Sequence, residues 1–348
     1  MNFANRGEWS ELYAIGYLLL NGGGFGADEH AKRDSSIFYK VLQIVDNPSG
    51  RFETIYTLGE SEIQVTQEGI GIVKIKKSNL APKLGTFFKQ LVQQSGSRAF
   101  ALTSGDALLK TLMRDKVSSS SSNVEDLHLI LEDIETKIST PKLSFSIKSE
   151  LGSPATIFNA SHSTNLTFRI KGPSTAKPFS NVSTVKTNLR TLIAEGFSLE
   201  FVEYDNPTLH SSLENIDSNL PFYLAELMLN YYTSTTTNLE RLCNSSWPSN
   251  IKQSELKIQK IKKFLSATAM GMRANQLWSG YPKDFGGLLL VKENGDVLFY
   301  YLYNLQKFEE YLFRNLRFET PSASRHGFGQ VYNHDGESRI KLNLQIRY

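Results

Sequence analysis

Apolar residues recur along this chain with two different periods, and a chain that has both must combine strands with helices. Four short segments between residues 37 and 76 alternate apolar with polar side chains, and Gly, Pro and Asp residues separate them. The segments are residues 37–45, 52–58, 63–66 and 70–76. Because a period of two is typical of strands with one buried face, this region is predicted to be a small β subdomain.

Residues 5–24, which precede this region, have the period of an amphipathic helix, which is clearest over residues 9–20. Asn5 is placed to cap that helix, and Glu8 three residues later completes the pattern of a capping box. The glycine-rich residues 22–26 are predicted to end the helix. A phosphate-binding loop is the less favoured interpretation, because the segment follows a helix and no Lys-Ser or Lys-Thr pair comes after it. Glu8 and Glu11 share one face of the helix.

The rest of the chain alternates between the same two kinds of segment. Helices are expected at residues 80–95, 99–115 and 254–270, and most of residues 184–274 has helical character. Strands are expected at residues 126–131, 143–148, 164–171, 288–292, 296–302, 331–332 and 340–348. The first two of these strands are predicted to form an antiparallel hairpin with a long loop. The expected fold is α/β or α+β, with a mixed central sheet flanked by helices and with β insertions.

A length of 348 residues allows one large domain with insertions or two domains. Residues 1–117 are predicted to hold the N-terminal helix, the β subdomain and basic helices. Residues 118–182 begin with a serine-rich loop at 118–122 and hold the central strands, and residues 183–348 hold a helical region and a β-rich C-terminal part. These three stretches are also compatible with one continuous domain.

Composition narrows the classes of function. The single cysteine, Cys243, excludes an intrachain disulfide and a zinc cluster of thiolates, and six scattered histidines argue against an all-histidine metal site. A formal net charge of +3 permits nucleic acid as a partner without requiring it. The sequence shows neither a secretory signal nor an apolar run of membrane-spanning length, so a soluble cytoplasmic protein is expected.

The residues that point most directly to chemistry lie between positions 126 and 148. If the two strands there are antiparallel neighbours, Asp126 at the start of one lies beside Lys148 at the end of the other. Phosphodiester hydrolysis uses such a pair, because a carboxylate holds Mg²⁺, which activates water, and a lysine stabilises the developing charge. The alternative interpretation of the same spacing is a strand-start residue and a solvated strand end.

The arrangement resembles the PD-(D/E)xK nuclease core, whose motif is an acid, a spacer and then acid-x-Lys. This chain departs from the motif, because Ser146 stands two residues before Lys148 where the motif has a carboxylate. A second carboxylate must therefore come from elsewhere. Glu11 and Glu8 on the N-terminal helix are ranked first as its donors, and Glu150, two residues beyond Lys148, is ranked next.

Three blocks of sequence resemble HpaII-type restriction endonucleases. They are Gly7-Glu-Trp-Ser-Glu11, then Phe145-Ser-Ile-Lys-Ser-Glu-Leu-Gly-Ser-Pro-Ala-Thr-Ile-Phe-Asn-Ala-Ser161, and finally Glu319-Thr-Pro-Ser-Ala-Ser-Arg-His326 with Lys341-Leu-Asn-Leu-Gln-Ile-Arg347. The blocks occur in order across nearly the whole chain, which short chance matches would not do. The resemblance implies a type II restriction endonuclease of the PD-(D/E)xK superfamily that uses Mg²⁺. In such a site Asp126 and Glu11 are the expected ligands of the metal ion.

The resemblance also implies double-stranded DNA as the substrate and a cognate DNA methyltransferase as a functional rather than physical partner. The namesake of the family cuts at CCGG, so CCGG or a related short sequence is the expected site. A palindromic site would favour a homodimer with two-fold symmetry. A second hypothesis, motivated by Ser146, is a sequence-specific DNA-binding protein with a degenerate and inactive nuclease core.

Two segments near the C-terminus carry side chains of the kind that read bases, and Arg325 in the first could contact a guanine edge through two hydrogen bonds. Solvated surfaces are the alternative interpretation of both segments. Lys260 and Lys263, on the basic helix, are expected to contact phosphates. The base-reading candidates are Ser324, Arg325 and His326 in the loop at 322–329, and Asn343, Gln345 and Arg347, which are predicted to share one face of the last strand.

Overall fold

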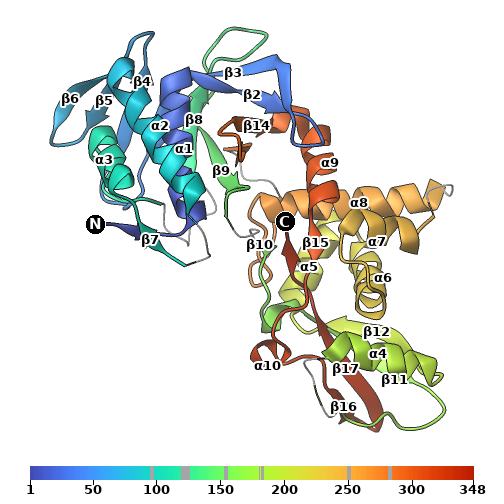
Figure 1. Ribbon diagram of the computed structural model, residues 1–348. Helices are drawn as coiled ribbons and strands as arrows, with labels where there is room; N and C mark the ends of the chain where they lie inside the picture. Colours follow the sequence, from blue (N-terminus) through green and yellow to red (C-terminus); the bar gives the residue numbers. More distant parts are fainter. Residues whose placement is uncertain are drawn as a thin grey trace. The chain divides into compact units, whose positions relative to one another are not determined.

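The computed structural model describes residues 1–94, 98–118, 126–152, 156–179, 181, 184–248, 252–280 and 284–348. The chain forms two compact units, whose elements are labelled in Figure 1. Unit 1 comprises Met1–Ala155 and Pro282–Phe308, and unit 2 comprises Thr156–Tyr281 and Glu309–Tyr348. The sequence-based boundaries near residues 117 and 182 stay predictions. The serine-rich loop expected at 118–122 lies outside the described residues except for Ser118.

Unit 1 is built on a mixed sheet whose strand order, within the described residues, is β2-β14-β13-β9-β8-β3-β4-β5-β6. Neighbouring strands are antiparallel except for the pairs β9–β13 and β14–β2, which are parallel. The predicted β subdomain is confirmed, since β3 to β6 form an antiparallel meander. The strands are β2 (Gly23–Ala27), β3 (Arg33–Asp46), β4 (Thr54–Leu58), β5 (Glu62–Gln67), β6 (Gly71–Lys76), β8 (Leu127–Leu131), β9 (Leu143–Ser149), β13 (Phe285–Val291) and β14 (Val297–Tyr301).

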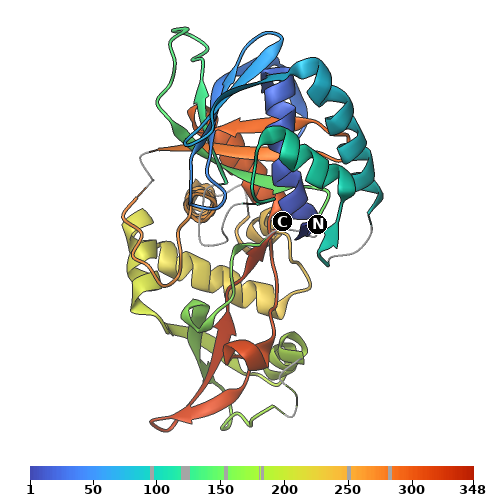
Figure 2. The same cartoon turned by 90° about the vertical axis from the view of Figure 1, so that its left-hand side faces the viewer.

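Three helices pack together beside this sheet: α1 (Arg6–Asn21), α2 (Lys77–Gln93) and α3 (Thr103–Leu112). Figures 1 and 2 show them side by side, and their apolar side chains share one core with the strands. The predicted capping box is confirmed: the Asn5 side chain accepts from the Glu8 amide at 3.0 Å, and the Glu8 carboxylate accepts from the Asn5 amide at 2.6 Å. Gly22, with a φ of 73°, ends α1 as predicted. The short strands β1 (Phe3–Ala4) and β7 (Phe100–Ala101) pair at the edge of this layer.

Unit 2 combines a sheet of strand order β12-β11-β17-β16 with a smaller one of order β10-β18-β15, among the residues that the structure describes. Its strands are β10 (Thr156–Phe158), β11 (Asn165–Lys171), β12 (Ser198–Tyr204), β15 (Arg317–Phe318), β16 (Val331–His334), β17 (Glu337–Asn343) and β18 (Ile346–Arg347). Its helices are α4 (Val185–Ala194), α5 (Pro207–Ile216), α6 (Leu220–Thr233), α7 (Leu239–Ser246), α8 (Lys252–Ala269) and α10 (Ala323–His326), with a 3-10 turn η1 (His162–Thr164). Helix α9 (Leu305–Asn315) contains the boundary between the units, which lies after Phe308.

The region of unit 2 predicted to be mostly helical is confirmed as such, and it also contains an edge strand, β12, which pairs with β11. Another expectation about unit 2 is corrected by the structure. The last strand is not continuous, because β17 ends at Asn343 and β18 pairs instead with β10 and β15. Leu344 is fully buried at this break. The chain therefore passes from one sheet of the unit to the other between Asn343 and Ile346.

None of the helices in the described residues combines the length and the apolar composition that crossing a bilayer would require.

Candidate active site and base-reading surface

The predicted hairpin between β8 and β9 is confirmed, with Leu127 opposite Phe145 and His128 opposite Ser144. Asp126, just before β8, is fixed to β9 through two hydrogen bonds. Its amide donates to the Phe145 carbonyl at 3.0 Å, and its carboxylate accepts from the Ile147 amide at 2.6 Å. The carboxylate of Asp126 is thus held one residue away from Lys148 on the neighbouring strand.

Alternation along β9 decides which face of the sheet each side chain occupies. Phe145 and Ile147 are buried in the core that α1 covers, so Ser146 and Lys148 lie on the opposite face. Ser146 is 2% exposed and lies opposite Leu288 of the parallel strand β13, whereas Lys148 is half-buried near the strand end. The structure therefore places Ser146 and Lys148 on the same face, and only Lys148 is accessible.

Helix α1 crosses the end of β9. The Ser10 hydroxyl lies 2.8 Å from the Ser149 hydroxyl, and the Arg6 guanidinium donates to the Leu151 carbonyl at 2.6 Å. Trp9 is fully buried and anchors the helix. Glu11, next to Ser10, is half-buried. The helix therefore carries a carboxylate to the end of the strand that holds Lys148, although α1 itself packs on the other face.

Glu11 lies near a buried ion pair that the sequence did not indicate, and this ion pair marks one end of the sheet. Arg114, after α3, donates from Nε to the Asp46 carboxylate at 2.7 Å, and these two side chains are 1% and 0% exposed. Burial alone would lower the pKa of Arg114, but the nearby carboxylates of Asp46 and Glu11 hold it above its ordinary value. Asp46 ends β3, and the adjoining Val45 lies opposite His128 of β8. Glu11 and Asp126 thus lie toward the same end of the sheet.

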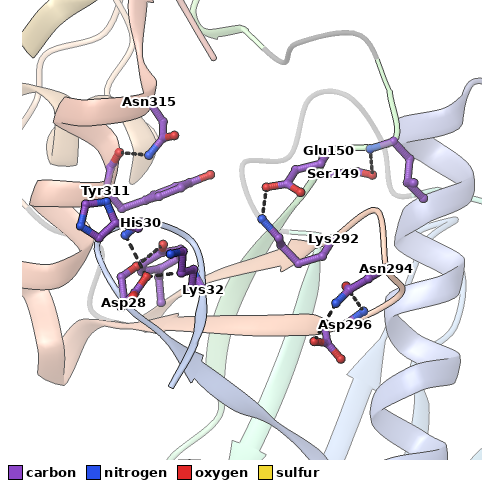
Figure 3. A network of polar contacts seen from close by, with 12 residues as sticks. Asp28, His30, Lys32, Ser149, Glu150, Lys292, Asn294, Asp296, Tyr311 and Asn315 are labelled. Atoms are coloured by element: carbon purple, nitrogen blue, oxygen red, sulfur yellow. Dashed lines mark hydrogen bonds and ion pairs between the residues drawn. The ribbon is translucent and has the colours of Figure 1, made fainter. Parts of the chain in front are cut away.

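Two further carboxylates were predicted for the site, Glu8 and Glu150, and both take part in structural contacts. Glu8 accepts the capping hydrogen bond from Asn5, which gives it a role in starting α1. Glu150 is exposed and forms an ion pair with Lys292, drawn in Figure 3, while its amide donates to the Val291 carbonyl at 3.0 Å. Across the described chain, no group of three or more His, Cys, Asp and Glu side chains gathers to hold a metal ion. A metal site here would rest on two carboxylates.

In unit 2, the loop predicted to read bases contains the single-turn helix α10, which Gly327 ends with a φ of 63°. Ser324 and Arg325 are exposed, and the structure records no ion pair for Arg325 with any described residue. The pKa of His326 is lowered, first because the imidazole is partly buried and then because the charges of Arg325 and His162 lie nearby. The lowered pKa favours the neutral form of His326, whereas Arg325 keeps its positive charge in this loop.

The prediction that Asn343, Gln345 and Arg347 share one accessible face of a continuous strand is wrong, because Asn343 is buried and the strand is broken. Asn343 is fully buried, and its amide donates to the Ser161 carbonyl and to Asn165 Oδ1, both at 2.7 Å. It therefore holds the sheet together and cannot reach a base edge. Gln345 lies in the break between β17 and β18, and Arg347 forms an ion pair with Glu319 at 2.7 Å.

Three lysines of the basic helix α8 form ion pairs with carboxylates, so fewer of its charges are available to DNA than its composition suggested. Lys260 pairs with Asp217 at 2.5 Å, and Lys257 pairs with Glu226 at 2.8 Å. Lys262 is buried against Glu310. Lys263 is exposed, so it is the better of the two predicted phosphate contacts.

Comparison with known proteins identifies the class to which this fold and these residues belong. The sequence profile of the HpaII restriction endonuclease matches residues 5–348. The type II restriction enzyme HpaII of Haemophilus parainfluenzae is 37% identical over an alignment of 357 residues. The alignment covers 99% of this chain and 98% of that enzyme. No solved structure matches the chain. The chain belongs to the HpaII restriction endonuclease family, and the resemblance seen in the three sequence blocks is confirmed.

Proposed function

We propose that this protein is a Mg²⁺-dependent type II endonuclease that cleaves double-stranded DNA at a short specific site, CCGG or a related sequence. The observation that carries the proposal is the β8–β9 hairpin, in which the Asp126 carboxylate is fixed by the Ile147 amide at 2.6 Å, next to Lys148. Family membership supports the same activity.

The topology around this hairpin supports a PD-(D/E)xK type of core. A helix, α1, precedes three antiparallel neighbours, β3, β8 and β9, and β13 then joins β9 in parallel. This is a mixed sheet with a covering helix, as expected for that core. Ser146 replaces the usual acid, and its burial in the middle of the sheet makes it a packing residue rather than a metal ligand.

The oxygen donors at this end of the sheet fit Mg²⁺ better than a softer metal. Mg²⁺ binds through one or two carboxylates, keeps several waters and takes further oxygens from a phosphate substrate. Asp126 and Glu11 would hold it, and no thiolate or third acid is needed. When bound, the ion would lower the pKa of a water molecule and neutralise charge on the phosphate.

The protein side chains then act on the substrate in separate ways. The Lys148 ammonium stabilises the negative charge that develops on the scissile phosphate and orients the attacking water. The hydrogen bond from the Ile147 amide keeps the Asp126 carboxylate fixed, so its position does not have to be established during the reaction. In unit 2, Arg325 contacts a guanine edge, with Ser324 and His326 beside it.

Two partners follow from this function. A cognate DNA methyltransferase protects the host's own sites without touching the enzyme, and a palindromic site is matched by a homodimer that supplies one active site to each strand.

The test is digestion of a plasmid of known sequence in Mg²⁺ and, separately, in Ca²⁺, followed by mapping of the ends. We expect cleavage at one short sequence in Mg²⁺, and specific binding without cleavage in Ca²⁺. Binding at one sequence without cleavage in Mg²⁺ would instead show a DNA-binding protein with a degenerate core. Digestion without sequence preference would contradict the proposed specificity.

A further inference from the structure

Unit 2 contains a polar pocket that no sequence motif indicated. It has a volume of about 370 Å³ and is lined by residues of η1, of the start of α5, of β17 and of the turn after α10. The side-chain amide of Asn165 donates to the backbone carbonyl of His326 at 3.0 Å. The helix that carries Arg325 is therefore fixed to the wall of this pocket. The lining side chains include His162, Ser163, Asp205, Asn206 and Lys341.

An ion pair between Asp205 and Lys341 lies in the lining of this pocket. The Lys341 ammonium donates to Asp205 Oδ2 at 2.6 Å, and the Thr167 hydroxyl donates to Asp205 Oδ1 at 2.7 Å. The side chains of Asp205 and Lys341 are 17% and 35% exposed. The carboxylate is thus held on both oxygens, and both side chains remain partly exposed.

Neither group uses its full hydrogen-bonding capacity in these contacts. An ionised carboxylate has about four acceptor positions and an ammonium has three donors, so each can accept or donate further bonds. The pair therefore presents an acceptor directly beside a donor. In the major groove, a G·C pair presents the matching pattern, with a donor at cytosine N4 and acceptors at guanine O6 and N7.

We infer that the Asp205–Lys341 pair is a specificity determinant that reads the major-groove edge of one G·C base pair. The Asp205 carboxylate accepts from cytosine N4, and the Lys341 ammonium donates to guanine O6 or N7. This inference rests on the proposed function, since it names residues that would give the endonuclease its sequence preference.

A base edge fits this pair better than a phosphate does. Asp205 and Lys341 together carry no net charge, whereas a phosphate contact gains its energy from an uncompensated cation and the release of counterions. The Asp205 carboxylate would repel a phosphate oxygen directly. The nearby Arg325 supplies the uncompensated cation that a second guanine or the adjacent backbone would need.

The experiment measures equilibrium binding in Ca²⁺ of the full-length protein to its cognate duplex and to every duplex with a single base-pair substitution. The variants are Asp205→Asn and Lys341→Met. Glu200→Gln is the matched control, because Glu200 lies on β12, close to Asp205 in sequence, and its partner Lys171 at 2.8 Å is exposed. Thermal unfolding of each variant shows whether it is folded.

For both variants we expect discrimination at one G·C position to fall by roughly 5- to 150-fold, with unchanged discrimination elsewhere. Glu200→Gln should discriminate like the wild type. Equal weakening on every duplex would identify a phosphate contact and overturn the inference, and so would unchanged discrimination at all positions. If Asp205→Asn does not fold, Lys341→Met alone decides between these outcomes. Failure of the proposed function is separate, because the wild-type protein itself would then show no preferred site.

Discussion

Two ion pairs, one in each unit, hold the end of a strand in different ways. Asp46, at the end of β3, binds Arg114 with both side chains at most 1% exposed. Asp205, just after β12, binds Lys341 with side chains that are 17% and 35% exposed. The first pair has no access to a substrate, and it can act only by fixing the strand end beside the proposed catalytic residues. The second pair is accessible, and its remaining donors and acceptors are available to a ligand.

On the proposed function, chemistry belongs to unit 1 and base recognition to unit 2. The largest expected effect is that of Lys148→Ala, which we expect to lower the single-turnover cleavage rate in Mg²⁺ by at least about 10³-fold, because it removes the charge next to the scissile phosphate. Site-specific binding in Ca²⁺ should be unchanged, since the proposed role of Lys148 is at the phosphate and not at a base. Cleavage at the wild-type rate would rule out a catalytic role for Lys148.

The two ion pairs should differ in their effect on stability. Arg114→Met leaves the buried Asp46 carboxylate without its partner, so we expect a loss of roughly 3–5 kcal/mol in the free energy of unfolding. Lys341→Met should cost less than about 1 kcal/mol, because the Asp205 carboxylate can be solvated. Denaturant titration measures both values. Equal losses would show that exposure does not distinguish the two pairs.

The second metal ligand is tested by three matched substitutions of Glu by Gln. Glu11→Gln should lower the cleavage rate by about 10²-fold or more, because it removes one of two carboxylates from the metal site. Glu8→Gln should leave it nearly unchanged, because glutamine also completes a capping box. Glu150→Gln should have little effect, since Glu150 pairs with Lys292. If Glu150→Gln is inactive and Glu11→Gln is normal, the second acid lies on the strand.

The smallest expected effect concerns contacts with the DNA backbone. Lys263→Ala should reduce the slope of log affinity against log salt concentration by about one, because Lys263 is exposed on α8. Lys260→Ala should change the slope less, since Lys260 is already paired with Asp217 at 2.5 Å. An unchanged slope for Lys263→Ala would make that face of α8 an ordinary solvated surface.

Periodicity predicted much of the fold, because local patterns decide where elements begin and end. The capping box of α1, the strands of the β subdomain and the β8–β9 hairpin were all predicted from residues close together in sequence. The strand β12 was not, since it is an edge strand in a region with strong helical patterns. The break after Asn343 was also missed, because alternation does not show where a strand leaves one sheet for another.

The candidate sites, too, were predictable only where residues close together in sequence form them. Asp126 and Lys148 could be assigned to one end of the sheet from sequence because a single hairpin joins their strands. Arg114 with Asp46, and Lys341 with Asp205, are far apart in sequence, and each pair meets only through the packing of its unit. Asn343 looked like a base-reading residue from its type and spacing, but its burial was not visible in the alternation of the last strand.

The central claim, that Asp126 holds the catalytic metal ion at the β8–β9 hairpin, is tested most directly by a Mg²⁺ titration of Asp126→Asn. The measured quantity is the single-turnover cleavage rate of prebound cognate DNA, with specific binding in Ca²⁺ as the control. We expect cleavage to require far more Mg²⁺ and to remain slower at saturation, while the control stays close to wild type, because an amide is a weaker ligand than a carboxylate. A Mg²⁺ dependence identical to that of the wild type would contradict the assignment.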